Sequence, residues 1–139
     1  MKFTIGCDPE FFLRHRESGK LISAIPYVEG TKYEPKPLPK GGNIQRDNVA
    51  VEVATDPASN IDTFVNAIRN TLTEAVKTLP QDTEIVALPS ANFDTSELDH
   101  PEAQAFGCDP DFDAWEICEN EKPCANGLKL KPLGFKHTF

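Results

Sequence analysis

The chain has 139 residues, of which 39% are hydrophobic, and its 14 lysines and arginines against 22 aspartates and glutamates give a net charge of −8. This length and composition are typical of one globular domain, so we expect residues 1–139 to form a single domain. A nucleic-acid-binding surface needs clustered positive charge, and the acidic balance argues against that class. It is compatible with the binding of divalent cations or of a basic partner surface.

The sequence also bears on where the protein resides. No apolar run approaches the roughly 20 residues of a membrane helix, and the first residues lack the order of a signal peptide. We therefore expect a cytoplasmic protein that makes no membrane contact. Because that compartment is reducing, its cysteines are expected to be reduced thiols; they are Cys7, Cys108, Cys118 and Cys124. Their spacing fits no zinc template, so buried thiols are the simpler interpretation.

The first elements along the chain are predicted to be strands. Residues 2–7 alternate apolar and small or polar side chains, which predicts a strand with one buried face formed by Phe3, Ile5 and Cys7. Pro9 interrupts the ladder. Residues 11–15 and 21–25 then predict a hairpin around a Ser-Gly-Lys turn.

Residues 26–43 are rich in proline and end in two glycines, which indicates a long loop. Such a loop inside a small domain is often a lid or a binding loop, and it can equally be a solvated connection. The sequence leaves both interpretations open.

Residues 48–55 give the clearest strand, in which Val49, Val51 and Val53 alternate with smaller or polar side chains. Glu52 lies on the opposite face between two alanines. A solvated strand face usually carries several polar residues, so a single acid among alanines indicates a floor for a small cationic ligand.

The segment from Ile61 to Leu79 is predicted to be an amphipathic helix, started by Ser59 or Asn60 and followed by Pro80. We expect its apolar stripe to pack in the core; the stripe is Ile61, Phe64, Val65, Ile68, Leu72, Val76 and Leu79. Short elements are predicted after it: a strand over residues 83–89, a helical turn over 101–106 and a strand over 127–135.

Two stretches share the order Gly-Cys-Asp-Pro, an acid and Phe. In residues 6–11, Asp8 and Glu10 flank Pro9, so both carboxylates can project to one side of a kinked strand. Together with Glu52 they could hold a hard divalent cation, or Asp8 and Pro9 could simply form a turn. In residues 107–112 the same pattern lies in an irregular acidic stretch, where turn residues are the simpler explanation.

Four segments in order resemble the phage-type COOH·NH2 ligases, a group of amidoligases of the glutamine synthetase and glutamate–cysteine ligase superfold. They are "IGCDPEFFL", "GGNIQRDNVAVEVATDPASN", "LPSANFD" and "HPEAQAFGCDPDFDAW". The resemblance implies an α+β fold, with a curved, mainly antiparallel sheet and at least one long amphipathic helix. It also implies ATP- and Mg²⁺-dependent amide-bond formation, in which ATP phosphorylates a carboxylate and an amine attacks the acyl phosphate.

By position in these motifs, the resemblance implies that Glu10 and Glu52 bind metal, with Asp8 as a weaker ligand. It implies contact with substrate or nucleotide for Gln45, Arg46 and Asn48. The second Gly-Cys-Asp-Pro stretch belongs to the same pattern, with a structural or substrate-facing role.

The resemblance covers only the N-terminal half of the family's domain. Family members continue with a Gly-Gly-His-x-His segment and further strands, whereas this chain reads Gly134, Lys136 and His137 at that place. We therefore expect an incomplete glutamine-synthetase-like catalytic domain, whose open sheet edge is closed by a second copy or by another chain. The alternative is a non-catalytic acidic phage protein that uses this scaffold to bind and inhibit a host factor.

Overall fold

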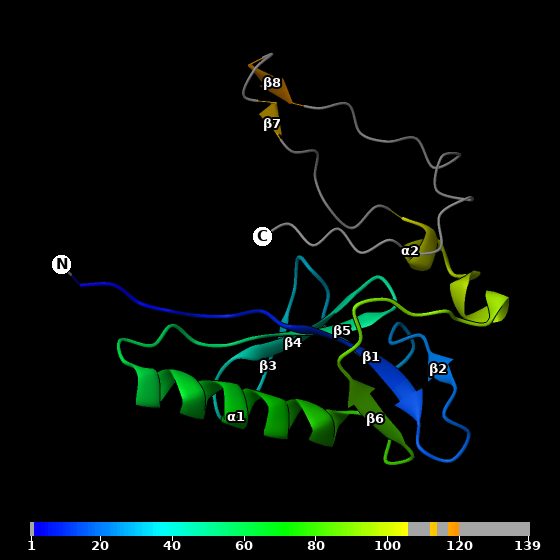
Figure 1. Ribbon diagram of the computed structural model, residues 1–139, viewed down its shortest axis with the longest axis horizontal. Helices are drawn as coiled ribbons and strands as arrows, with labels where there is room; N and C mark the ends of the chain where they lie inside the picture. Colours follow the sequence, from blue (N-terminus) through cyan, green and yellow to red (C-terminus); the bar gives the residue numbers. More distant parts are fainter. Residues whose placement is uncertain (1, 106–111, 114–116, 120–139) are drawn as a thin grey trace.

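The computed structural model describes residues 2–105, 112–113 and 117–119 (Figure 1). These residues form an α+β structure. The strands are β1 (Glu10–His15), β2 (Leu21–Ile22), β3 (Lys36–Pro37), β4 (Asn43–Asp47), β5 (Ala50–Ala54), β6 (Thr83–Val86), β7 (Phe112–Asp113) and β8 (Cys118–Glu119). The helices are α1 (Ile61–Thr78), the 3₁₀ turn η1 (Thr95–Leu98) and α2 (Pro101–Gln104).

The main sheet is antiparallel and curled, and β1 is its central strand. Its order is β2-β1-β5-β4-β3, and β6 pairs with β1 as a further strand. The predicted hairpin of residues 11–15 and 21–25 is confirmed, because Leu13 lies opposite Ile22. The expected α+β class with a curved antiparallel sheet is therefore correct. β7 and β8 pair only with each other among the described residues.

The prediction of a strand over residues 2–7 is wrong. The first strand begins at Glu10, after Pro9, and the preceding segment makes only an isolated bridge between Ile5 and Ala58. Its apolar side chains do not share a buried face, because Phe3 is 67% exposed and Ile5 is also exposed. The segment runs beside the connection between β5 and α1, to which it is joined by the backbone hydrogen bonds of Ile5 with Ala58 and of Cys7 with Thr55.

Helix α1 begins where the sequence predicted, and it ends one residue earlier. The Asn60 side chain accepts a 2.9 Å hydrogen bond from the Thr63 N–H, which caps the first turn. Leu79 is extended and precedes Pro80, which cannot continue the helix.

The expectation that the whole apolar stripe of α1 packs in the core is only partly correct. Leu79 is buried and Leu72 packs against the core, whereas Ile61, Val65 and Val76 are exposed. The sheet is shorter than the helix, so it covers mainly the C-terminal half (Figure 1). The N-terminal half of α1 therefore carries an apolar surface without a covering layer among the described residues.

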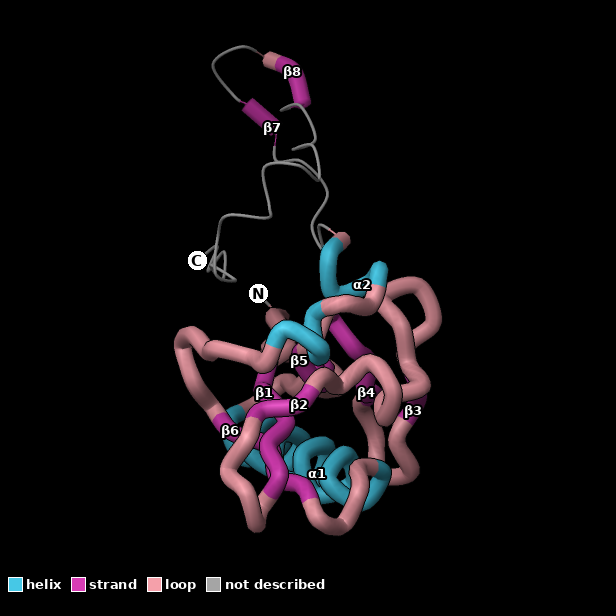
Figure 2. Tube along the Cα trace, turned by 90° about the vertical axis from the view of Figure 1, so that its right-hand side faces the viewer, coloured by secondary structure: helices cyan, strands magenta, loops and turns pink. Residues whose placement is uncertain are grey.

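The core lies on both faces of the sheet. Figure 2 shows α1 on one side of the sheet and α2 on the other. On the first face, Ile44, Val51 and Val53 form a cluster with Ala75 and Leu79 at the end of α1. On the other, a smaller cluster joins the sheet to α2; it consists of Phe12, Val49, Ala50 and Ala103. The prediction that Val49, Val51 and Val53 share one face is correct only for Val51 and Val53. Val49 packs with Ala50 in the smaller cluster, because it lies in the turn before β5 begins and not in the strand. The remainder of the opposite face of β4 and β5 is left for polar side chains.

The segment of residues 26–43 is mostly loop, as predicted, and its β3 extends the sheet beyond β4. The predicted strand after α1 and the helical turn near residue 101 also form. Residues 107–111 and the strand predicted over 127–135 lie outside the described residues. Within the described ranges, no helix combines the length and apolar character that a membrane span requires.

Candidate metal centre

Three adjacent strands place acidic and amide side chains on one face of the sheet. Glu10 of β1 lies directly opposite Glu52 of β5, and Gln45 of β4 lies opposite Glu52 on its other side. Asp47 follows Gln45 by two residues and pairs with Ala50. Because side chains alternate along a strand, Gln45, Asp47 and Glu52 share the face opposite Ile44, Val51 and Val53.

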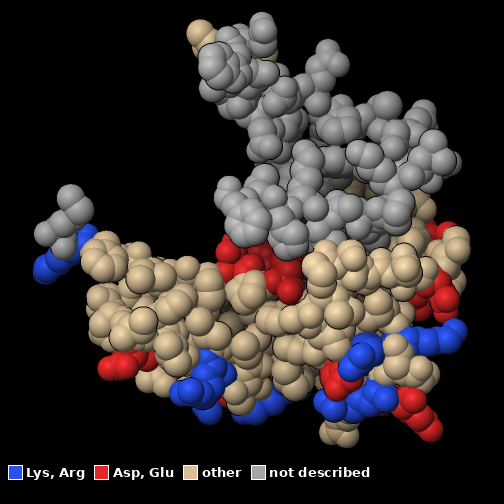
Figure 3. Space-filling view, in the orientation of Figure 1, with Lys and Arg blue, Asp and Glu red and all other residues tan. Residues whose placement is uncertain are grey.

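The carboxylates of Glu10, Asp47 and Glu52 converge. One oxygen from each lies within 4.8 Å of the other two; Glu10 is exposed and the other two are partly buried. Hard divalent cations bind carboxylate oxygens at roughly 2.0–2.6 Å, so ligands on opposite sides of such an ion lie about 4–5 Å apart. The three oxygens therefore fit one divalent cation. Figure 3 shows acidic side chains gathered in the middle of the molecule, beside the sheet.

The electrostatics of this acidic cluster, defined as Glu10, Asp47 and Glu52, favour the gain of positive charge. Burial raises the pKa of Glu52, and repulsion from Asp47 and Asp8 raises it further, while the Gln45 hydrogen bond and Lys32 lower it. Burial likewise raises the pKa of Asp47, with Lys32 opposing the shift. The ionised forms of both carboxylates are thus electrostatically destabilised, and a bound cation would stabilise them.

Gln45 positions Glu52 within the cluster. Its Nε2 donates a 2.9 Å hydrogen bond to Glu52 Oε2, which fixes one carboxylate oxygen and leaves the other available. A hydrogen bond to the ionised form also favours that form, which a metal ligand requires. The residue that the sequence assigned to substrate or nucleotide therefore contacts a candidate metal ligand in this structure.

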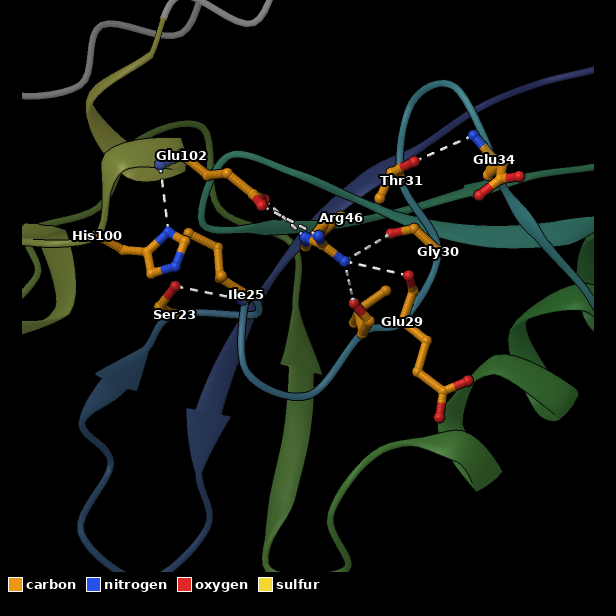
Figure 4. Close-up of polar contacts among 10 residues, drawn as sticks. Ser23, Ile25, Glu29, Gly30, Thr31, Glu34, Arg46, His100 and Glu102 are labelled. Carbon is orange, nitrogen blue, oxygen red and sulfur yellow. Dashed lines mark hydrogen bonds and ion pairs between the residues drawn. The ribbon is translucent and has the colours of Figure 1, made fainter.

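Arg46 and Asn48 both form hydrogen bonds with other parts of the chain, and Figure 4 shows those of Arg46. Arg46 Nε donates to Glu102 of α2 at 2.6 Å, and its Nη1 donates to the carbonyls of Val28 and Glu29. Asn48 has a left-handed backbone with φ of 55° and donates from Nδ2 to the Ala105 carbonyl at 3.1 Å. Neither residue belongs to the acidic cluster, and their predicted contact with substrate or nucleotide stays a prediction.

The aspartate that converges with Glu10 and Glu52 is Asp47, and not the predicted Asp8. Asp8 lies close enough to repel the charge of Glu52, but it is not one of the three converging carboxylates. Asp47 was missed. The signal for it was the Asn48-Val49 pair, because a two-residue turn with Asn at positive φ sets Asp47 opposite Ala50 and so on the face of Glu52.

Comparison with known proteins adds no relative. No protein-family model matches the chain, and neither the curated proteins nor the solved structures contain a match. The resemblance to the COOH·NH2 ligases rests on the four sequence motifs, and the activity it implies stays a prediction.

Proposed function

We propose that this protein binds Mg²⁺ and ATP and acts in ATP-dependent ligation of a carboxylate to an amine, on a domain of the glutamine synthetase superfold. The observation that carries the proposal is the convergence of Glu10, Asp47 and Glu52 on one face of a curled antiparallel sheet. Two of these three, Glu10 and Glu52, are also the residues that the sequence motifs assign to metal. The fit of the three oxygens to one hard cation supports the same assignment.

In this proposal the chain's own residues hold and orient the cation. Glu10, Asp47 and Glu52 would be the protein ligands, and Gln45 would fix the Glu52 carboxylate. The bound ion would supply neutralisation of phosphate charge, which is the largest electrostatic demand of phosphoryl transfer. The half-buried setting of Asp47 and Glu52 would strengthen their interaction with it, because less water screens them.

The test is calorimetric titration of the purified protein with Mn²⁺ and with Mg²⁺–ATP. We expect saturable binding that Glu52→Gln and Glu10→Ala abolish. Asp94→Asn is the matched control, because Asp94 is an exposed acid that pairs with Lys20 away from the cluster. Absence of binding to a folded wild-type protein would contradict the proposal, as would equal losses in the control.

A second candidate function is non-catalytic binding to a host protein, with a phage origin for the chain. The observation that favours it is the exposed apolar surface at the start of α1, where Ile61 is 72% exposed and Val65, one turn away, is also exposed. With a net charge of −8 such a surface would suit a partner with apolar and basic groups. Binding that survives Glu52→Ala and is lost in Ile61→Glu would favour this function over ligation.

A further inference from the structure

The loop that follows Val28 is fastened to the edge of β4. The Arg46 N–H donates a 2.9 Å hydrogen bond to the Gly30 carbonyl, and a Cβ at Gly30 would overlap the carbonyl oxygen of Ile44. Only glycine allows this approach. Thr31 and Glu34 then close a tight turn by reciprocal backbone hydrogen bonds of 3.0 and 3.2 Å.

The Arg46 side chain adds a second fastening to the same loop. Its Nη1 donates to the carbonyls of Val28, Glu29 and Gly30 at 2.9, 3.1 and 3.4 Å. The other edge of the guanidinium grips both carboxylate oxygens of Glu102. The Arg46 side chain is only 17% exposed, whereas Glu102 is 45% exposed, so the hydrogen bonds to the loop carbonyls of Val28 and Gly30 are the better shielded from water. Several directed hydrogen bonds from one charged group hold the loop in one place.

Lys32 lies in this fastened loop, in the turn that follows Gly30. The turn between Gly30 and Lys36 rises from the sheet on the side away from α1, which Figures 1 and 4 both show. Gln45, Asp47 and Glu52 face that same side, because Ile44, Val51 and Val53 face α1. The electrostatic effect of Lys32 on both Asp47 and Glu52 agrees with this placement.

We propose that Arg46 is a positioning residue, which holds the Gly30–Lys36 turn so that Lys32 forms the anion-binding side of the acidic cluster. The ligand class is then a metal-bound oxyanion, either a phosphate or a carboxylate. This identity of the ligand rests on the proposed function, whereas the positioning of Lys32 by Arg46 does not. Arg46 therefore acts through Lys32 and contacts no ligand.

Zero-length carbodiimide crosslinking of the metal-free protein tests the positioning. We expect Lys32 to couple to Asp47 or Glu52 in the wild type, and the yield to fall several-fold in Arg46→Met. The yield should fall less in Arg46→Lys, which keeps the positive charge but loses the planar guanidinium that donates hydrogen bonds on two edges. Glu102→Gln should retain the crosslink, because it removes only the contact with α2. The Lys20–Asp94 pair, 2.9 Å apart, is the internal control.

An unchanged Lys32 crosslink in a folded Arg46→Met or Arg46→Lys protein would overturn the positioning role, as would its absence from the wild type. The ligand is tested separately, with inorganic phosphate and acetate as probes of the Mn²⁺-loaded protein. Lys32→Met and Arg46→Met should both weaken oxyanion binding and tighten Mn²⁺ binding, since a positive charge leaves the cluster. A purely structural Arg46 would weaken both.

Binding of phosphate alone would identify the oxyanion as that of a nucleotide, and binding of acetate alone would identify a carboxylate substrate. Binding of neither, or binding that Lys32→Met leaves unchanged, would overturn the ligand assignment. If the wild type takes up no Mn²⁺, the proposed function fails, and the crosslinking result alone decides the role of Arg46.

Discussion

At the scale of single residues, Glu52 is an acid whose environment works against its charge. Its pKa is raised from the ordinary 4.5 by burial and by the acids around it. An acid with a raised pKa binds more protons in the folded state than in the unfolded state, so the stability of the fold falls as the pH rises through that range. The carboxylate therefore costs stability at neutral pH in the metal-free protein.

We predict that Glu52→Gln stabilises the metal-free protein at about pH 7, by about 1 kcal/mol at most, because solvent screens a half-buried group. The difference should vanish below the ordinary pKa of 4.5, where Glu52 is protonated in both states. Urea denaturation at a series of pH values measures it. A variant that is less stable than the wild type at neutral pH would contradict this account.

A second prediction at this scale concerns the fastening of the loop at Gly30. Gly30→Ala should destabilise the protein by about 2 kcal/mol or more, because its Cβ would overlap backbone atoms of Ile44 in β4 and Lys36 in β3, and paired strands cannot move without losing hydrogen bonds. Gly19→Ala is the control. Gly19 has a φ of +68° but open space around it, so only the backbone penalty of about 1 kcal/mol applies. Equal losses in the two variants would contradict the steric explanation.

At the scale of elements, α1 is held at one end. We predict that Leu79→Ala costs about 2–4 kcal/mol, because Leu79 is 7% exposed and packs with Ile44 and Val53 in the larger core cluster. Ile61→Ala, at the exposed end of the same stripe, should change stability by less than about 0.5 kcal/mol. Thermal or urea denaturation compares them, and a large loss in Ile61→Ala would show that another part of the chain covers that end.

The same helix shows how far sequence periodicity reaches. The bounds of α1 were predictable because Asn60 and Pro80 mark its ends chemically, and the β5 strand was predictable because its valines alternate. The burial of the stripe was not, since periodicity records a helical face and says nothing about the length of the sheet beneath it. The predicted burial of Phe3 and Ile5 was wrong for a similar reason, because alternation along a strand does not ensure that another layer covers its apolar face.

At the scale of the whole molecule, the candidate site depends on strand pairing that single segments do not encode. Glu10 and Glu52 were predicted together from motif resemblance, and they prove to be register partners. Asp47 completes the cluster only because β4 and β5 pair through a two-residue turn, which sets its face. Arg46 and Asn48 lie in the same motif but serve the attachment of α2 and the loop.

The concentration of negative charge at one place makes the stability of the whole fold sensitive to divalent cations. An ion that binds the folded state and not the unfolded state stabilises it in proportion to the logarithm of its concentration, so Mn²⁺ or Mg²⁺ should raise the melting temperature at neutral pH. The gain should shrink on acidification, because protons and the cation compete for Asp47 and Glu52, whose pKa values are raised. Calorimetric melting at matched ionic strength separates this specific stabilisation from general screening by salt.

The variant Glu52→Gln should lose the cation-dependent rise in melting temperature, although its metal-free form is more stable than the metal-free wild type. The two effects have opposite signs only if the Glu52 carboxylate destabilises the metal-free fold and stabilises the fold with a bound cation. A cation effect of the same size in Glu52→Gln would mean that the ions act on the overall charge of −8 and not on this cluster.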